Sequence, residues 1–245
     1  MLPSIVAVIL GARFACGTSI VAIRTPVEVV VGADSLASWH SDASSPIFIE
    51  KILPAGRSFF ATAKLVADDQ GQFDVPRAIR ETHQDDQPML RSIQRFETVI
   101  LPQLQDVATH LHRYELPYFE REVLNKSMLE VAFFAWEASG PALSLRYFTV
   151  SIGADGSPGV AVTRRDCPGD CPTGVVYTAL GHHDAIDTAL RGNPRFWQRG
   201  TVDAVIGLIE LEKKAKPRYV GGPITILRIT ARGPQWIRPH TKLAP

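Results

Sequence analysis

The sequence predicts an α+β domain in which two packed sheets are flanked by helices. Three observations predict it: β-branched runs separated by turn signals occur towards both ends of the chain, helical periodicity fills the middle, and the resulting order is strands, helices, strands, helices, strand. The chain has 245 residues, of which 45% are hydrophobic. This length and composition are enough to bury one sizeable core and suit a single domain.

The first predicted elements are strands, over residues 19–24, 27–33, 47–53 and 58–63. The first two are joined by Thr25 and Pro26, and we expect them to form a hairpin. The second is almost continuously apolar, as is typical of a strand buried on both faces.

The middle of the chain is predicted to be helical. Residues 90–114 carry an apolar side chain at every third or fourth position, which predicts one long helix with an apolar stripe. Pro102 should kink or divide this helix, because proline removes an i→i−4 hydrogen bond. A shorter helix is predicted over residues 76–83.

Strand patterns return from residue 129, and the predicted strands are 129–137, 143–152, 159–164, 175–180 and 224–230. Two helices are predicted between the last two strands, over residues 183–190 and 201–214. Thr201 is the predicted N-cap of the second helix, because its hydroxyl can accept a hydrogen bond from a free backbone N–H.

Charge and hydropathy argue against two classes of partner. The chain has 26 basic and 25 acidic residues, so no strong long-range field draws it to nucleic acid. No apolar stretch approaches the ~20 residues that a membrane-spanning helix needs. We therefore expect neither a nucleic-acid partner nor a membrane span.

Residues 1–17 differ from the rest and form a predicted leader ahead of a domain over 18–240. A short apolar run over residues 5–10 is followed by Ala15 and Gly17, the small residues that a signal peptidase accepts before Thr18. The α-amino group is the only positive charge ahead of this run, so an ordinary first strand or a disordered propeptide is an equal alternative. A signal peptide would place the protein in the periplasm or outside the cell; otherwise we expect it in the cytoplasm.

The cysteines are Cys16, Cys167 and Cys171. The last two are four residues apart across a Pro-Gly turn, a spacing that suits a small disulfide loop in an oxidising compartment. Two free thiols in a surface turn are the alternative in the cytoplasm. A zinc site would need about four ligands, and no second pair of cysteines or histidines has suitable spacing.

Thr18 is the candidate nucleophile. A threonine hydroxyl reacts only when a base removes its proton, and cleavage after Gly17 would place a free α-amine on the same residue. An α-amine has a pKa of about 8 and serves as a base near neutral pH. Lys51 is the candidate cation that lowers the pKa of the hydroxyl, and Asp34 is the candidate carboxylate that fixes this lysine.

The segments 17–23 (GTSIVAI) and 29–35 (VVVGADS) resemble the opening of proteasome β-subunits and their bacterial relatives. The interval from Thr18 to Asp34 equals the family interval without a gap, and Lys51 matches the family lysine if the preceding loop has one extra residue. Similarity continues more loosely in the segments 61–63, 67–68 and 220–224.

This resemblance implies a four-layer αββα fold of the N-terminal-nucleophile (Ntn) hydrolases. It also implies a threonine-type peptidase or amidohydrolase that is processed at Gly17 and uses Thr18, Asp34 and Lys51, without a metal or organic cofactor. The expected substrate is a peptide or small amide, and the expected assembly is a homo-oligomer.

The chain departs from the family pattern around these residues. Lys64 stands where the family has the glycine whose backbone N–H serves the oxyanion hole. His182 stands at the position of a supporting serine, and Pro217 and Val220 replace a supporting aspartate and serine. The alternative function is therefore a weakly active or inactive family member that acts as an assembly or binding subunit.

Overall fold

The computed structural model describes residues 15–16, 18–39, 42–68, 73–171, 174–193 and 195–238. In these residues the chain is an α+β protein, as the order of the predicted elements indicates, and its two large sheets are antiparallel with five strands each. A small sheet of three strands lies beside them.

The first large sheet has the order β11-β2-β3-β12-β13. Its strands are β2 (Ser19–Arg24), β3 (Val29–Asp34), β11 (Val176–Gly181), β12 (Ile224–Thr230) and β13 (Gly233–Arg238). Every residue of β2 and β3 is buried, which agrees with the apolar sequence of both strands apart from the polar residues at their ends. The predicted hairpin is confirmed, with Ile20 opposite Ala33.

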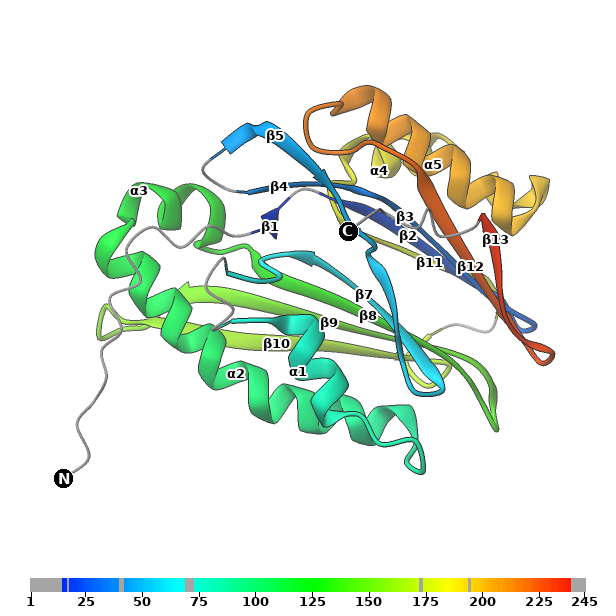
Figure 1. The fold of residues 1–245 in the computed structure, drawn as a ribbon, viewed down its shortest axis with the longest axis horizontal. Helices are drawn as coiled ribbons and strands as arrows, with labels where there is room; N and C mark the ends of the chain where they lie inside the picture. The colour runs from blue at the N-terminus through cyan, green and yellow to red at the C-terminus, as the bar shows by residue number, and fades with distance from the viewer. Residues whose placement is uncertain are drawn as a thin grey trace.

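The second large sheet has the order β10-β9-β8-β7-β6. Its strands are β6 (Ile52–Ala55), β7 (Ser58–Lys64), β8 (Ser127–Glu137), β9 (Gly140–Ile152) and β10 (Pro158–Cys167). The two sheets pack face to face, and apolar side chains from both fill the space between them, among them Ile20, Val31, Ala61, Phe134 and Leu227 (Figure 1).

The third sheet, of order β1-β4-β5, consists of β1 (Ala15–Cys16), β4 (Leu36–Trp39) and β5 (Asp42–Phe48). The prediction of a single strand over 47–53 is wrong, because β5 ends at Phe48 and a separate strand, β6, begins at Ile52. In the sequence, Glu50 and Lys51 interrupt the apolar residues of this segment, and the structure shows that its two ends belong to different sheets. Lys51 therefore lies in the connection between two strands and not within one.

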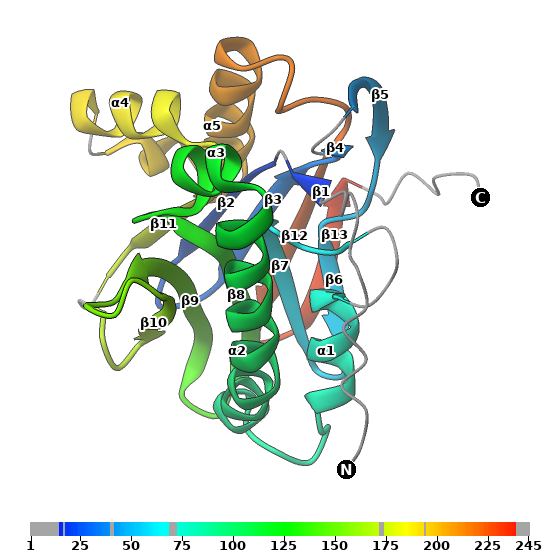
Figure 2. The same cartoon turned by 90° about the vertical axis from the view of Figure 1, so that its left-hand side faces the viewer.

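Helices cover the outer faces of both sheets. The helices α4 (Asp184–Gly192) and α5 (Thr201–Ala215) pack against β2, β3 and β12. The helices α1 (Val75–Thr82) and α2 (Met89–Tyr114) pack on the second sheet. Figure 1 shows the two groups of helices on opposite sides of the pair of sheets, and in the view of Figure 2 α2 lies in front of the strands.

Two short segments complete the helical part: α3 (Leu116–Tyr118), which runs into a π-helical turn (Phe119–Val123), and a 3₁₀ turn (Phe196–Arg199). No helix in the described part of the chain is long and apolar enough to cross a membrane.

Two details of the helices differ from prediction. Pro102 does not divide α2, because Pro102 and Thr98 are both exposed and the carbonyl freed at Thr98 lies on the solvent side. Thr201 is the first residue of α5, and the N-cap position is taken by Gly200. The Thr201 hydroxyl donates instead to the buried carboxylate of Glu28.

Candidate active site

Thr18 lies directly before β2, at one end of the first large sheet, and is only 4% exposed. Its hydroxyl donates to Asp34 Oδ1 over 3.1 Å. Its main-chain carbonyl accepts a hydrogen bond from the His182 backbone N–H over 2.7 Å. Both its hydroxyl and its backbone are thus held in place. Gly17, the predicted processing residue, is outside the described residues.

Asp34 is the centre of the hydrogen-bond network. Its Oδ1 accepts from the Thr18 hydroxyl, from the Ser19 backbone N–H at 2.8 Å and from Lys51 Nζ at 2.8 Å. Its Oδ2 accepts from the Gly221 backbone N–H at 2.8 Å. Four donors from three separate parts of the chain therefore fix a carboxylate that is 1% exposed.

Lys51 is the cation of the network and is also buried. Its ammonium donates to Asp34 and to the main-chain carbonyl of Leu36. Burial lowers the pKa of Lys51 to about 8, although the charge of Asp34 and the hydrogen bond to it act in the opposite direction. The amine therefore changes charge close to physiological pH.

The hairpin explains why Thr18 and Asp34 meet. In the register of β2 and β3, Ile20 is opposite Ala33, so the residues just beyond this pair lie side by side. On the other side of β3, Ile224 is opposite Asp34, and the turn before β12 places Gly221 over the carboxylate.

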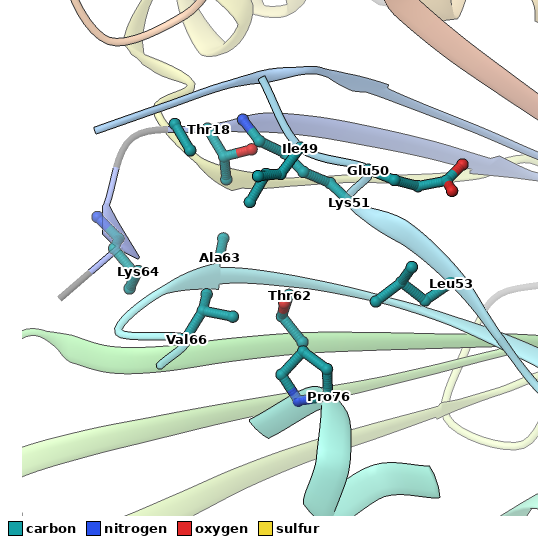
Figure 3. Close-up of a pocket in the computed structure, with 11 residues that line it drawn as sticks. Thr18, Ile49, Glu50, Lys51, Leu53, Thr62, Ala63, Lys64, Val66 and Pro76 are labelled. Atoms are coloured by element: carbon teal, nitrogen blue, oxygen red, sulfur yellow. The ribbon is translucent and has the colours of Figure 1, made fainter. Parts of the chain in front are cut away.

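A small pocket of about 50 Å³ adjoins Thr18. Figure 3 shows Lys51 extending from one wall towards Thr18, while Glu50 points the other way. The remaining lining is mostly apolar and consists of Ala37, Ile49, Leu53, Thr62, Ala63, Lys64, Val66 and Pro76. Such a pocket can hold a small apolar group beside the Thr18 hydroxyl.

Lys64, the predicted oxyanion residue, lies in the wall of this pocket at the end of β7. Its φ of 73° is in the left-handed region, which favours glycine. The backbone at Lys64 thus has the conformation expected of a glycine, although the residue carries a long side chain.

His182, the predicted supporting residue, contacts Thr18 through its backbone N–H. Its ring lies against Tyr219, with centroids 5.0 Å apart. Burial, followed by the positive charges of Lys216 and Lys64, lowers the pKa of His182 to about 4. The imidazole is therefore neutral at physiological pH.

Sequence reasoning missed some residues of this site. Gly221 and Leu36 act through backbone groups, which a sequence pattern does not reveal. Glu130 is a buried carboxylate on β8 that accepts from the Gly181 backbone N–H at 2.7 Å. The one available signal was a charged residue inside an apolar strand.

The two described residues before Thr18 form β1, which pairs antiparallel with β4. Ala15 is opposite Trp39, and Cys16 is opposite Ser38. Ala15 and Cys16 therefore lie as a short extended strand along the edge of β4.

The predicted pair Cys167 and Cys171 is joined in a disulfide, with a Cα–Cα distance of 5.1 Å. Cys167 is opposite Leu143 of β9. Two residues earlier on that strand, the Pro141 carbonyl accepts a hydrogen bond from Arg24, which is at the end of β2 away from Thr18. Among the described residues, no group of three or more His, Cys, Asp or Glu side chains is arranged to hold a metal ion.

Comparison with known proteins adds no assignment to this geometry. No protein-family model matches the chain, and no curated protein is significantly similar to it.

Proposed function

We propose that this chain is an Ntn hydrolase similar to proteasome β-subunits, a threonine-type peptidase or amidohydrolase in which cleavage after Gly17 exposes Thr18. The observation that carries the proposal is that the Thr18 hydroxyl and the Lys51 ammonium donate to the same oxygen, Asp34 Oδ1. Helices on both outer faces of two packed sheets support the four-layer αββα arrangement of that class.

In the proposed reaction, the Thr18 α-amine takes the proton of the Thr18 hydroxyl as the oxygen attacks the amide carbonyl carbon. The Lys51 ammonium favours the developing alkoxide, and the Lys64 backbone N–H is the proposed donor to the oxyanion. The C–N bond then breaks, and the α-amine delivers the proton to the leaving nitrogen. Water then attacks the resulting ester and gives a proton to the α-amine. The bond between the acyl carbon and the Thr18 oxygen breaks, and the α-amine returns the proton to this oxygen, which releases the acid and restores free Thr18.

The pocket indicates the class of side chain on the acyl side of the scissile bond. Its walls include Ala37, Ile49 and Val66, and its volume is about 50 Å³. We therefore propose a small aliphatic side chain. A larger side chain would exceed the volume of the pocket, and a charged one would be buried without a hydrogen-bond partner.

The pairing of β1 with β4 favours a peptide over a small amide. Once the leader is cut away, the edge of β4 that pairs with Ala15 and Cys16 becomes free to pair with an extended peptide. Main-chain hydrogen bonds along this edge would align a scissile bond with Thr18.

A non-catalytic assembly subunit is the second candidate. It is favoured by the side chain of Lys64, which lies in the pocket wall where a substrate backbone would pass. The proposed homo-oligomer is compatible with both candidates, and its size can be measured by native mass spectrometry.

Intact mass and N-terminal sequencing of the protein expressed from the full-length sequence test the proposal. We expect a chain that begins at Thr18 and reacts with a small aliphatic β-lactone to form an ester on Thr18. The Thr18→Ala variant should either retain residues 1–17 or, if it is cut, form no ester with the β-lactone. A chain that retains residues 1–17 and does not react would favour the assembly subunit.

A further inference from the structure

Glu130 connects the two large sheets at the end where Thr18 lies. It belongs to β8 of the second sheet, opposite Ala63 of β7, and is 5% exposed. Along β8 it shares a face with Ala132 and Phe134, whose side chains lie in the core between the sheets. Its Oε2 accepts the backbone N–H of Gly181, the last residue of β11 in the first sheet.

The Gly181 turn bears directly on Thr18. Gly181 has a φ of 78°, and a Cβ added to it would lie 2.2 Å from the Thr18 carbonyl oxygen. The next residue, His182, donates its backbone N–H to that same oxygen over 2.7 Å. A displacement of the turn would therefore displace the backbone of Thr18.

The surroundings of Glu130 partly compensate its charge. The hydrogen bond from the Gly181 N–H favours the carboxylate, as do the interactions with Lys64, on β7, and with His183, in the turn before α4. Burial acts more strongly, and the pKa of Glu130 is raised above its usual range. On β9, Tyr147 is directly opposite Glu130, and its hydroxyl is hydrogen-bonded to Thr178.

On this geometry, and resting on the proposed function, we propose that Glu130 is a positioning residue for Thr18. Its carboxylate holds the Gly181–His182 turn from the opposite sheet, and the turn holds the Thr18 carbonyl. It takes over an orienting role from the supporting side chains that are replaced at His182, Pro217 and Val220.

Two conservative variants test this role. Glu130→Gln keeps the length of the side chain and an oxygen that can accept from Gly181, whereas Glu130→Asp keeps the charge but is one methylene too short to reach. Glu28→Gln is the matched control, because Glu28 is also a buried glutamate but lies at the far end of β2 and β3, bonded to Thr201 and Arg228.

The first measurement is the labelling of Thr18 by the small aliphatic β-lactone, resolved into kinact and KI. We expect Glu130→Asp to lower kinact by about 10- to 100-fold with little change in KI, since misplacement of a reacting group acts on the chemical step. Glu130→Gln and Glu28→Gln should stay within about threefold of the wild type. The proposal would be overturned if Glu130→Asp were labelled with the kinact of the wild type, or if Glu28→Gln lost as much kinact as Glu130→Asp.

The second measurement does not depend on activity. Hydrogen exchange followed by mass spectrometry should show faster exchange over residues 181–182 in Glu130→Asp but not in Glu28→Gln. If the wild-type protein is not labelled at Thr18, the proposed function fails, and exchange alone then decides the role of Glu130. Unchanged exchange over residues 181–182 would overturn it.

Discussion

Gly181 packs its α-carbon against the main chain of Thr18, with no room for a side chain between them: an added Cβ would lie 2.2 Å from the Thr18 carbonyl oxygen. The carbonyl also accepts from the residue that follows Gly181. The end of β11 thereby sets the position of the candidate nucleophile.

This contact predicts that Gly181→Ala is more harmful than the same change at Gly156. Both glycines have a φ of 78°, but a Cβ at Gly156 would meet nothing within 4 Å. Left-handed strain alone should lower the free energy of unfolding of Gly156→Ala by about 1–2 kcal/mol. Gly181→Ala should lose more than this in urea titrations and should also lose β-lactone labelling. Equal losses in the two variants would show that the close approach to Thr18 has no consequence.

The buried pair of Asp34 and Lys51 predicts non-additive effects on stability. Asp34→Asn leaves the Lys51 ammonium buried without its counter-charge, which typically costs about 3–5 kcal/mol. Lys51→Met removes the counter-charge of the Asp34 carboxylate, which keeps its hydrogen bonds from Thr18, Ser19 and Gly221. The double variant removes both charges, and we expect it to be more stable than the sum of the two single changes implies. Additive losses in chemical denaturation would contradict the coupling.

The pKa of Lys51 predicts an alkaline limit on the reaction. The proposed mechanism needs the ammonium, and the fraction of Lys51 that carries it falls as the pH rises through about 8. Labelling of Thr18 should therefore decline above this pH, while the α-amine, which must be neutral, limits the reaction below about pH 8. The expected profile of kinact is a narrow bell. A rate that stays level up to pH 10 would mean that the Lys51 charge is not required.

His182 predicts a loss of stability in mild acid. Its folded-state pKa is lowered from 6.5 to about 4, so between these values the unfolded chain binds the proton and the folded chain does not. The free energy of unfolding should therefore rise with pH across this window and fall as the pH is lowered through it. His182→Gln should flatten this part of the curve, with His183→Gln as the control. An unchanged slope in His182→Gln would assign the pH dependence to other groups.

The disulfide predicts a difference between the processed and unprocessed chains. A chain that begins at Thr18 contains only Cys167 and Cys171, whereas the full chain also contains Cys16. Alkylation without reductant should add no label to the processed chain, and reduction should expose two thiols. Removing the bridge by Cys171→Ser should lower the free energy of unfolding by about 2 kcal/mol, as loop closure over a short segment implies. Two freely alkylated thiols in the oxidised protein would contradict the pairing.

Local patterns in the sequence were sufficient for the long helices, for most strands of the two large sheets and for one part of the site. The β-branched runs of β2 and β3 and the turn between them determine a hairpin, and a hairpin of that length brings Thr18 beside Asp34. The apolar stripe of α2 likewise predicts its buried face. These features depend on neighbours in the chain, which a sequence displays directly.

Only the tertiary structure decided how the rest of the site is assembled. Lys51 reaches Asp34 because the chain passes from the small sheet to the second large sheet just before β6, within the segment that the sequence pattern predicts as a single strand. The Gly221 N–H and the Glu130 carboxylate arrive from segments far away in sequence, and their contacts with Asp34 and Gly181 exist only once the sheets have packed. The lowered pKa of Lys51 has the same origin, because desolvation is a property of the packed core.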